Sequence, residues 1–160
     1  MSDPGSSAQD RPNRIPWPPL LYAITLLAAY ILQRVLPLPP LFEAGIARFV
    51  GGASCVLGLA IGMSGIAQFR KVGTPVDPTG RATTIATGGI YGWTRNPMYL
   101  SGVLVGAGLA LAWPSTWLLA LVPVMAMALF KLAIEREEAF LERRFGEDYR
   151  AYKARVRRWI

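Results

Sequence analysis

The sequence predicts an all-α integral membrane protein, a helical bundle of about four transmembrane helices followed by a cytoplasmic C-terminal helical segment. Three observations predict this class. Of the 160 residues, 52% are hydrophobic and 17% are charged, and the mean hydropathy is +0.32, whereas soluble domains carry about 25% charged residues. Four apolar runs of helical length follow one another. The charged residues gather mainly between and after these runs.

The chain begins with a polar segment. Residues 1–16 are rich in Pro, Ser and Asp and contain no apolar stretch, which predicts a disordered tail. They also lack the apolar core and the cleavage site of a signal peptide. We therefore expect residues 17–160 to form a single membrane domain.

The apolar runs predict where the spans lie. We expect transmembrane helices at about 20–36, 44–69, 98–113 and 116–134. The third run reaches only roughly 24 Å at about 1.5 Å per residue, a little short of a hydrocarbon core of about 30 Å. Only Pro114 and Ser115 separate it from the fourth run. The last two spans should therefore form a tight helical hairpin.

The loop between the second and third spans, residues 70–97, is polar and contains several prolines and glycines, which argues against a continuous helix. Fifteen of the 17 Lys and Arg residues lie in the tail, in this loop or from Lys131 onward, and the two others are Arg34 and Arg48. The positive-inside rule therefore places both termini and the loop in the cytoplasm, as in a multi-pass protein of a prokaryotic inner membrane. The same rule accounts for the net charge of +7, and we expect no nucleic-acid partner.

Rare residue types exclude several kinds of site. The sequence has no histidine and one cysteine, Cys55, so a Ser-His-Asp triad, a Cys-His pair and an ordinary zinc site are excluded, and we expect no metal. Gly58 and Gly62 stand four residues apart in the second run, as Gly102 and Gly106 do in the third. This spacing favours close helix packing within one chain or between two, and it leaves the oligomeric state open.

After the fourth run the sequence is charged but periodic. Apolar and aromatic positions recur every three or four residues, at Leu141, Phe145, Tyr149, Tyr152 and Val156. This is the pattern of a helix with one buried stripe. Gly146 falls within the stripe and predicts a break between two helices, because glycine costs about 1 kcal/mol in a helix interior.

Acidic residues lie on or beside this stripe where the helix leaves the membrane. Extended backward, the stripe reaches Glu137 and Glu138, with Glu135 close by. A buried carboxylate there needs a cation or hydrogen-bond donors, and Arg95 borders an apolar run on the same side. Two interpretations stay open: a structural Arg95–Glu138 ion pair, or a pocket in which the acid binds the ammonium and the arginine the carboxylate of a zwitterion. The aromatic walls of such a pocket would be Tyr91, Tyr99 and Tyr149.

The two segments "TGGIYGWTRNPMYLSG" and "EREEAFLERRFGEDYRAYKARVRRW" together resemble the isoprenylcysteine carboxyl methyltransferase family and the related phospholipid N-methyltransferases. The likeness covers roughly residues 70–160. It consists of a Gly-x-Tyr turn, Arg-x-Pro-x-Tyr, two apolar runs, a Glu-Glu pair, Phe-Gly-x-x-Tyr-x-x-Tyr and a closing Val-x-Arg. Histidine is commonest in the family where this chain has Asn96, and an amide cannot carry a proton at neutral pH.

The resemblance implies a membrane enzyme that transfers the methyl group of S-adenosylmethionine, releasing S-adenosylhomocysteine, without a metal. The acceptor would be a lipophilic molecule or lipid of the carboxylate, amine or thiol type, methylated at the cytoplasmic membrane face. The cofactor region would be residues 70–99 and 135–160. Its implied cofactor-binding residues are Tyr91, Arg95, Pro97, Tyr99, Glu137, Glu138, Tyr149 and Tyr152. Its implied catalytic residues are Arg95, Glu138 and Asn96.

Two other functions stay open from the sequence. One is a membrane reductase of the sterol or fatty-acyl kind, which would consume NADPH in the presence of an enone lipid. The other is a non-catalytic membrane scaffold, which would show no saturable binding of S-adenosylmethionine. The acceptor itself is not predicted, because the first two apolar runs carry no residue diagnostic of a head group and an apolar tunnel discriminates weakly.

Overall fold

The computed structural model describes residues 15–73 and 84–160. The elements, in chain order, are α1 (Trp17–Val35), α2 (Ala44–Lys71), the 3₁₀ turn η2 (Gly89–Gly92), α3 (Pro97–Ala112), α4 (Thr116–Leu129), the π-helical turn η3 (Phe130–Ile134) and α5 (Glu135–Arg155). The structure is 79% helical and has no strand in its described part, which confirms the predicted all-α class. The predicted tail lies outside the described residues except for residues 15 and 16.

Helices cover the four apolar runs of the sequence. By length and composition, α1, α2 and the continuous helix Thr116–Arg155 can each cross a membrane. The fourth apolar helix, α3, has 16 residues and is shorter than those three, as its run in the sequence predicts. The chain is therefore an integral membrane protein with an all-α bundle.

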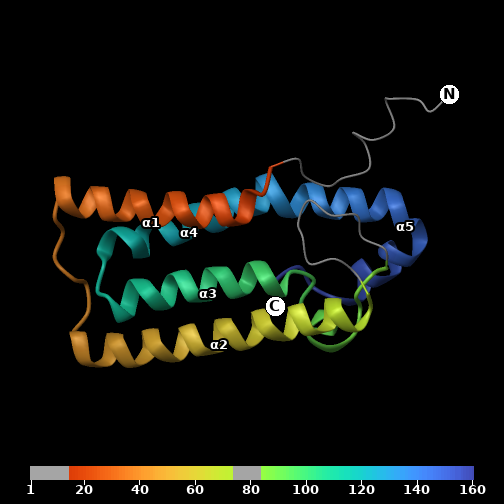
Figure 1. Cartoon of the computed structure of the whole chain (residues 1–160), viewed down its shortest axis with the longest axis horizontal. Coiled ribbons are helices and arrows are strands. Elements are labelled where there is room, and N and C mark those ends of the chain that lie inside the picture. Colours follow the sequence, from red (N-terminus) through yellow and green to blue (C-terminus); the bar gives the residue numbers. More distant parts are fainter. Residues whose placement is uncertain (1–14, 74–83) are drawn as a thin grey trace.

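The helices lie alongside one another, and α5 continues the direction of α4 beyond the ends of α1 and α3 (Figure 1). Helix α2 packs on α3, α3 on α4, and α4 on α1. The connections 36–43 and 113–115 meet at one end of the bundle, whereas η2, the start of α3 and α5 lie at the other (Figure 1). All of the sequence-predicted site residues therefore belong to the second end.

Small residues let α2 and α3 approach closely. A Cβ atom on Gly51 would lie 2.5 Å from the backbone oxygen of Gly108, and one on Gly58 would lie 3.0 Å from the backbone oxygen of Ser101. The hydroxyl of Ser54 donates to the backbone oxygen of Leu104 at 2.9 Å. A Cβ atom on Gly62 would lie 2.6 Å from the Ser101 hydroxyl oxygen, so Gly58 and Gly62, the pair singled out in the sequence, both pack against α3 within this chain.

The predicted hairpin is formed by a connection of three residues, 113–115. Ser115 is the N-cap residue of α4, and its hydroxyl accepts a hydrogen bond from the backbone N–H of Leu118 at 3.2 Å. Such a cap satisfies one of the backbone donors left free at a helix start.

A feature that the sequence did not predict is the π-helical turn η3, which joins α4 to α5. The buried positions of α4 include Val122, Met125 and Leu129, and beyond them Ala133 and Ile134 are both fully buried. Nine residues of ideal α-helix would place Glu138 about half a turn away from Leu129. The π turn holds more residues per turn, which rotates position 138 back toward the buried side.

The predicted break at Gly146 is confirmed. This glycine has φ 53° and ψ −122°, so α5 consists of two helical parts joined at a kink. A positive φ favours glycine because it has no Cβ. After the kink, Tyr149 and Tyr152 of the predicted stripe are buried.

Candidate functional site

The loop before α3 is bound along its backbone to the segment after α5. Thr94 and Arg157 form a parallel β-bridge, and the N–H of Arg95 donates to the backbone oxygen of Arg157 at 3.0 Å. The backbone oxygen of Arg158 accepts from the Thr94 hydroxyl and from the Asn96 amide, each at 3.1 Å. We call residues 156–159 the C-terminal strap. It fixes the loop that carries Arg95.

Glu138 lies between two arginines. Its Oε1 is 3.2 Å from Arg95 Nη2, and it accepts from Arg158 Nε at 3.0 Å and from Arg158 Nη2 at 2.7 Å, through its two oxygens. The side chains of Arg95 and Glu138 are 8% and 7% exposed. The expected contact between these two is therefore present. The hydrogen bonds to Glu138 raise the pKa of Arg158.

Sequence reasoning missed Arg158 as a partner of Glu138. The signal was available, because Arg158 is the arginine of the closing Val-x-Arg element. The chain turns from helix to extended backbone at Val156, and this turn is what brings Arg158 back to a glutamate 20 residues earlier.

Arg95 has unused hydrogen-bonding capacity. Its Nε and Nη1 are buried and have no partner among the described residues. Leaving a buried donor unpaired costs about 1–3 kcal/mol, and more where the group is charged. An anionic group placed against these nitrogens would remove that cost, so the guanidinium fits a ligand carboxylate.

The neighbouring acid, Glu137, has a different environment. Its Oε2 accepts a hydrogen bond from the Tyr99 hydroxyl at 2.8 Å. Among the described residues, no cationic side chain forms an ion pair with it. Both local cations are held by Glu138, which leaves Glu137 as the acid that can accept a cationic group of a ligand.

The remaining predicted residues form the packed surroundings. Tyr91 stacks on Phe69 with ring centroids 5.1 Å apart, and its backbone oxygen accepts from the Tyr152 hydroxyl at 2.8 Å. Burial raises the pKa of Tyr91, and it raises that of Tyr152 to about 12. Tyr149 is 2% exposed, and its pKa is also raised by burial and by the charge of Glu138. These tyrosines are therefore neutral at physiological pH.

Two further predicted residues set the backbone. Pro97 is fully buried at the first position of α3, where a missing N–H costs nothing. Asn96 precedes it, and its side chain does not cap the helix but donates to the strap. The structure thus shows the Asn96 amide in contact with a backbone oxygen, that of Arg158.

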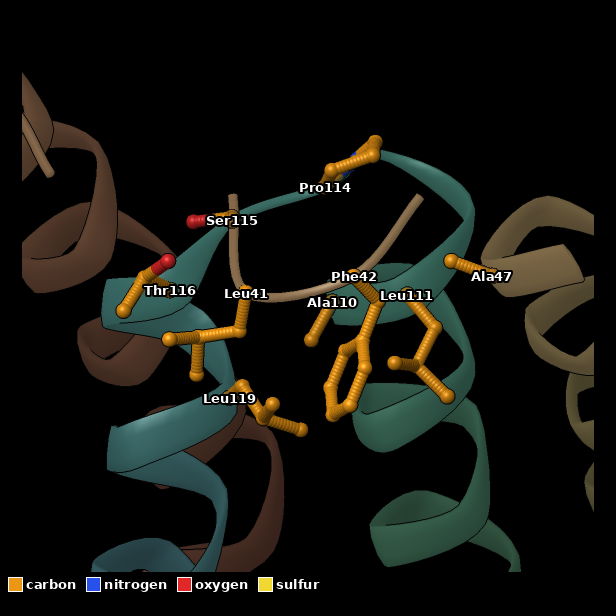
Figure 2. Close-up of a pocket in the computed structure, with 9 residues that line it drawn as sticks. All are labelled: Leu41, Phe42, Ala47, Ala110, Leu111, Pro114, Ser115, Thr116 and Leu119. Carbon is orange, nitrogen blue, oxygen red and sulfur yellow. The ribbon is translucent and has the colours of Figure 1, made fainter. Parts of the chain in front are cut away.

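The hollow shown in Figure 2 lies at the opposite end of the bundle from Glu138. Its cavity volume is only about 10 Å³, and it is lined by Leu41, Phe42, Ala47, Ala110, Leu111, Pro114, Ser115, Thr116 and Leu119. No charged side chain contributes to this lining. It therefore offers nothing to recognise a zwitterion. A second hollow lies between the end of α2 and η2, beside Lys71 and the exposed Trp93.

Comparison with known proteins identifies the family. The phospholipid methyltransferase family matches residues 46–148. A protein of Haemophilus influenzae described as uncharacterized is 39% identical over 69 residues, which is 39% of this chain and the whole of that protein. The family match takes in nearly all of α2, all of α3 and α4, both glutamates and the first part of α5. The chain therefore belongs to the phospholipid methyltransferase family and is a membrane methyltransferase.

Proposed function

We propose that this protein transfers a methyl group from S-adenosylmethionine to a lipophilic acceptor at the cytoplasmic membrane face. The proposal rests on two charged side chains of the site that lack full partners. Arg95 is buried with two nitrogens unpaired, and Glu137 has no cationic partner among the described residues. Together they complement the carboxylate and the ammonium of one amino-acid moiety.

The glutamates have different roles in this proposal. Glu138 holds Arg95 and Arg158, and it is already neutralised by them. Glu137 is the acid that receives the ligand ammonium, with Tyr99 fixing its orientation. This assignment refines the sequence-based one, which left open whether Glu138 binds the ammonium or holds Arg95.

The other residues position and enclose the ligand. Tyr91, Tyr149 and Tyr152 supply the aromatic surroundings, and Pro97 begins α3 at the site. Asn96 acts by binding the strap, not by carrying a proton. We propose residues 70–99 and 135–160 as the cofactor region, of which 74–83 lie outside the described part of the chain.

Little acid–base chemistry is required of the protein. When bound, S-adenosylmethionine supplies a sulfonium-borne methyl group that is already activated for in-line displacement. The protein's task is to align the acceptor and to exclude water. A phospholipid amine is the acceptor that the family name favours, and lipophilic carboxylates and thiols remain the alternatives to assay.

The first experiment is calorimetric binding of S-adenosylmethionine and S-adenosylhomocysteine to detergent-purified protein. We expect micromolar binding to the native protein and roughly 10-fold to 100-fold weaker binding to Arg95→Gln and to Glu137→Gln, because each loses a charge-assisted hydrogen bond. Glu135→Gln is the matched control, since the ion pair of Glu135 with a described residue is the one with Lys131 at the surface, and it should bind as the native protein does.

Absence of binding in a sample shown to be folded by circular dichroism would overturn the proposal. If Arg95→Gln and Glu137→Gln bind S-adenosylmethionine as tightly as the native protein, the cofactor is right but the proposed binding site is wrong. If binding is found, transfer of a labelled methyl group to phosphatidylethanolamine vesicles and to a prenylated cysteine separates the two acceptor classes.

A further inference from the structure

Arg158 is held from three directions. Its guanidinium makes two hydrogen bonds with the carboxylate of Glu138 and lies 4.9 Å from the ring centroid of Phe130, the first residue of η3. Its backbone oxygen accepts from Thr94 and Asn96. The next residue, Trp159, packs against the buried cluster around Leu129. The Arg158 side chain is therefore fixed both at its guanidinium and at its backbone.

This arrangement decides how Arg95 meets Glu138. A carboxylate in two-point contact with one guanidinium is fixed in orientation. Because Arg158 makes that contact, Arg95 reaches Glu138 through Nη2 alone, at 3.2 Å, and its Nε and Nη1 have no partner in the described part of the chain. Without Arg158, Glu138 could turn to meet Arg95 by two points, and the free nitrogens of Arg95 would be used internally.

We propose that Arg158 is a positioning residue that keeps Arg95 available for a ligand carboxylate, acting through Glu138. The proposal rests on the proposed function, since it takes the carboxylate to be that of S-adenosylmethionine. Arg158 lies beyond the segment that the family matches, residues 46–148. The strap is thus part of the binding site and not only of the fold.

The test uses two probes that differ by one group: S-adenosylmethionine and its decarboxylated analogue. We expect Arg158→Gln to weaken binding of S-adenosylmethionine about 10-fold and that of the analogue less than about 2-fold, because only the former has a carboxylate for Arg95. Arg158→Lys should fall between, since an ammonium cannot make the two-point contact. Arg155→Gln is the control, because Arg155 is exposed and its side-chain hydrogen bond to a described residue lies within α5.

A double-mutant cycle with Glu138→Gln separates indirect from direct action. If Arg158 acts through Glu138, Arg158→Gln should change affinity less than about 2-fold in the Glu138→Gln background. An equal loss in both backgrounds would show that Arg158 touches the ligand itself and would overturn the proposal. Equal weakening of both probes would also overturn it, by revealing a general structural role. Failure of the native protein to bind either probe would instead reject the proposed function.

Discussion

Two consecutive glutamates illustrate how neighbouring residues of one type take different roles. Glu138 faces two arginines, whereas Glu137 faces a tyrosine hydroxyl. Sequence reasoning could bring Arg95 and Glu138 together, because both border apolar runs on one side of the membrane. It could not predict which glutamate contacts the arginines and which contacts a tyrosine, since that depends on which of them Arg158 reaches.

At the same scale, the hydrogen bond from the Tyr152 hydroxyl to the backbone oxygen of Tyr91 should make a measurable contribution to the free energy of unfolding. Tyr152→Phe leaves that buried acceptor unpaired, which should cost about 1–3 kcal/mol and lower the thermal midpoint in detergent. Tyr30→Phe is the control, because among the described residues the Tyr30 hydroxyl bonds only to Arg34, at the surface. Equal midpoints for Tyr152→Phe and the native protein would contradict the role assigned to this bond.

The same bond predicts a pH dependence. The pKa of Tyr152 is raised to about 12 from an ordinary value of about 10, so the folded state holds this proton more tightly than the unfolded state. Its contribution is therefore complete below about pH 10 and is lost as the pH rises through about 12. We expect the difference in midpoint between native protein and Tyr152→Phe to be constant from about pH 6 to 9 and to shrink above about pH 10.

At the scale of elements, the sequence predicts the helices and one of the irregular turns between them, but not the other. Apolar run lengths place the spans, and Gly146 marks the kink because only a positive φ there is needed to break the helix. Apart from Lys131, the π turn at Phe130–Ile134 is as apolar as the α-helix before it, so no sequence pattern predicts it. The strap was missed for a related reason: its contacts depend on the chain turning back at Val156.

The glycines of α2 provide a test at this scale. A Cβ atom on Gly51 would lie 2.5 Å from backbone atoms of Gly108 and Ala112, whereas one on Gly52 would meet nothing within 4 Å. Gly51→Ala should therefore destabilise the protein by about 1–3 kcal/mol through overpacking. Gly52→Ala should be neutral or stabilising by up to about 1 kcal/mol, because alanine favours helix. Thermal unfolding in detergent compares the two, and equal midpoints would argue against the close α2–α3 contact.

At the scale of the whole molecule, the charge distribution predicts the orientation. The connection 36–43 lies at the end of the bundle opposite α5 (Figure 1), and most Lys and Arg residues lie on the α5 side. We therefore propose that α5 and the site face the cytoplasm. The sequence is sufficient for this proposal, because the rule needs only the order of spans and charges.

The single native cysteine makes this orientation testable. In a Cys55→Ala background, Leu41→Cys and Ile160→Cys each introduce one thiol at an exposed position, 64% and 82% exposed as native residues. An impermeant maleimide added to intact cells should label position 41, and position 160 only after permeabilisation. The opposite pattern would invert the topology and place the site outside.

The backbone pairing between the loop at Thr94–Asn96 and the strap has a consequence for the order of folding. Membrane spans can insert as separate helices before they associate, but the Asn96–Arg158 hydrogen bond joins positions 62 residues apart. Closing so long a loop is an entropic cost that only the assembled bundle offsets. We expect inserted helices to precede a competent site, so that the chain passes through a stage that is already embedded in the membrane but still unable to bind its ligand.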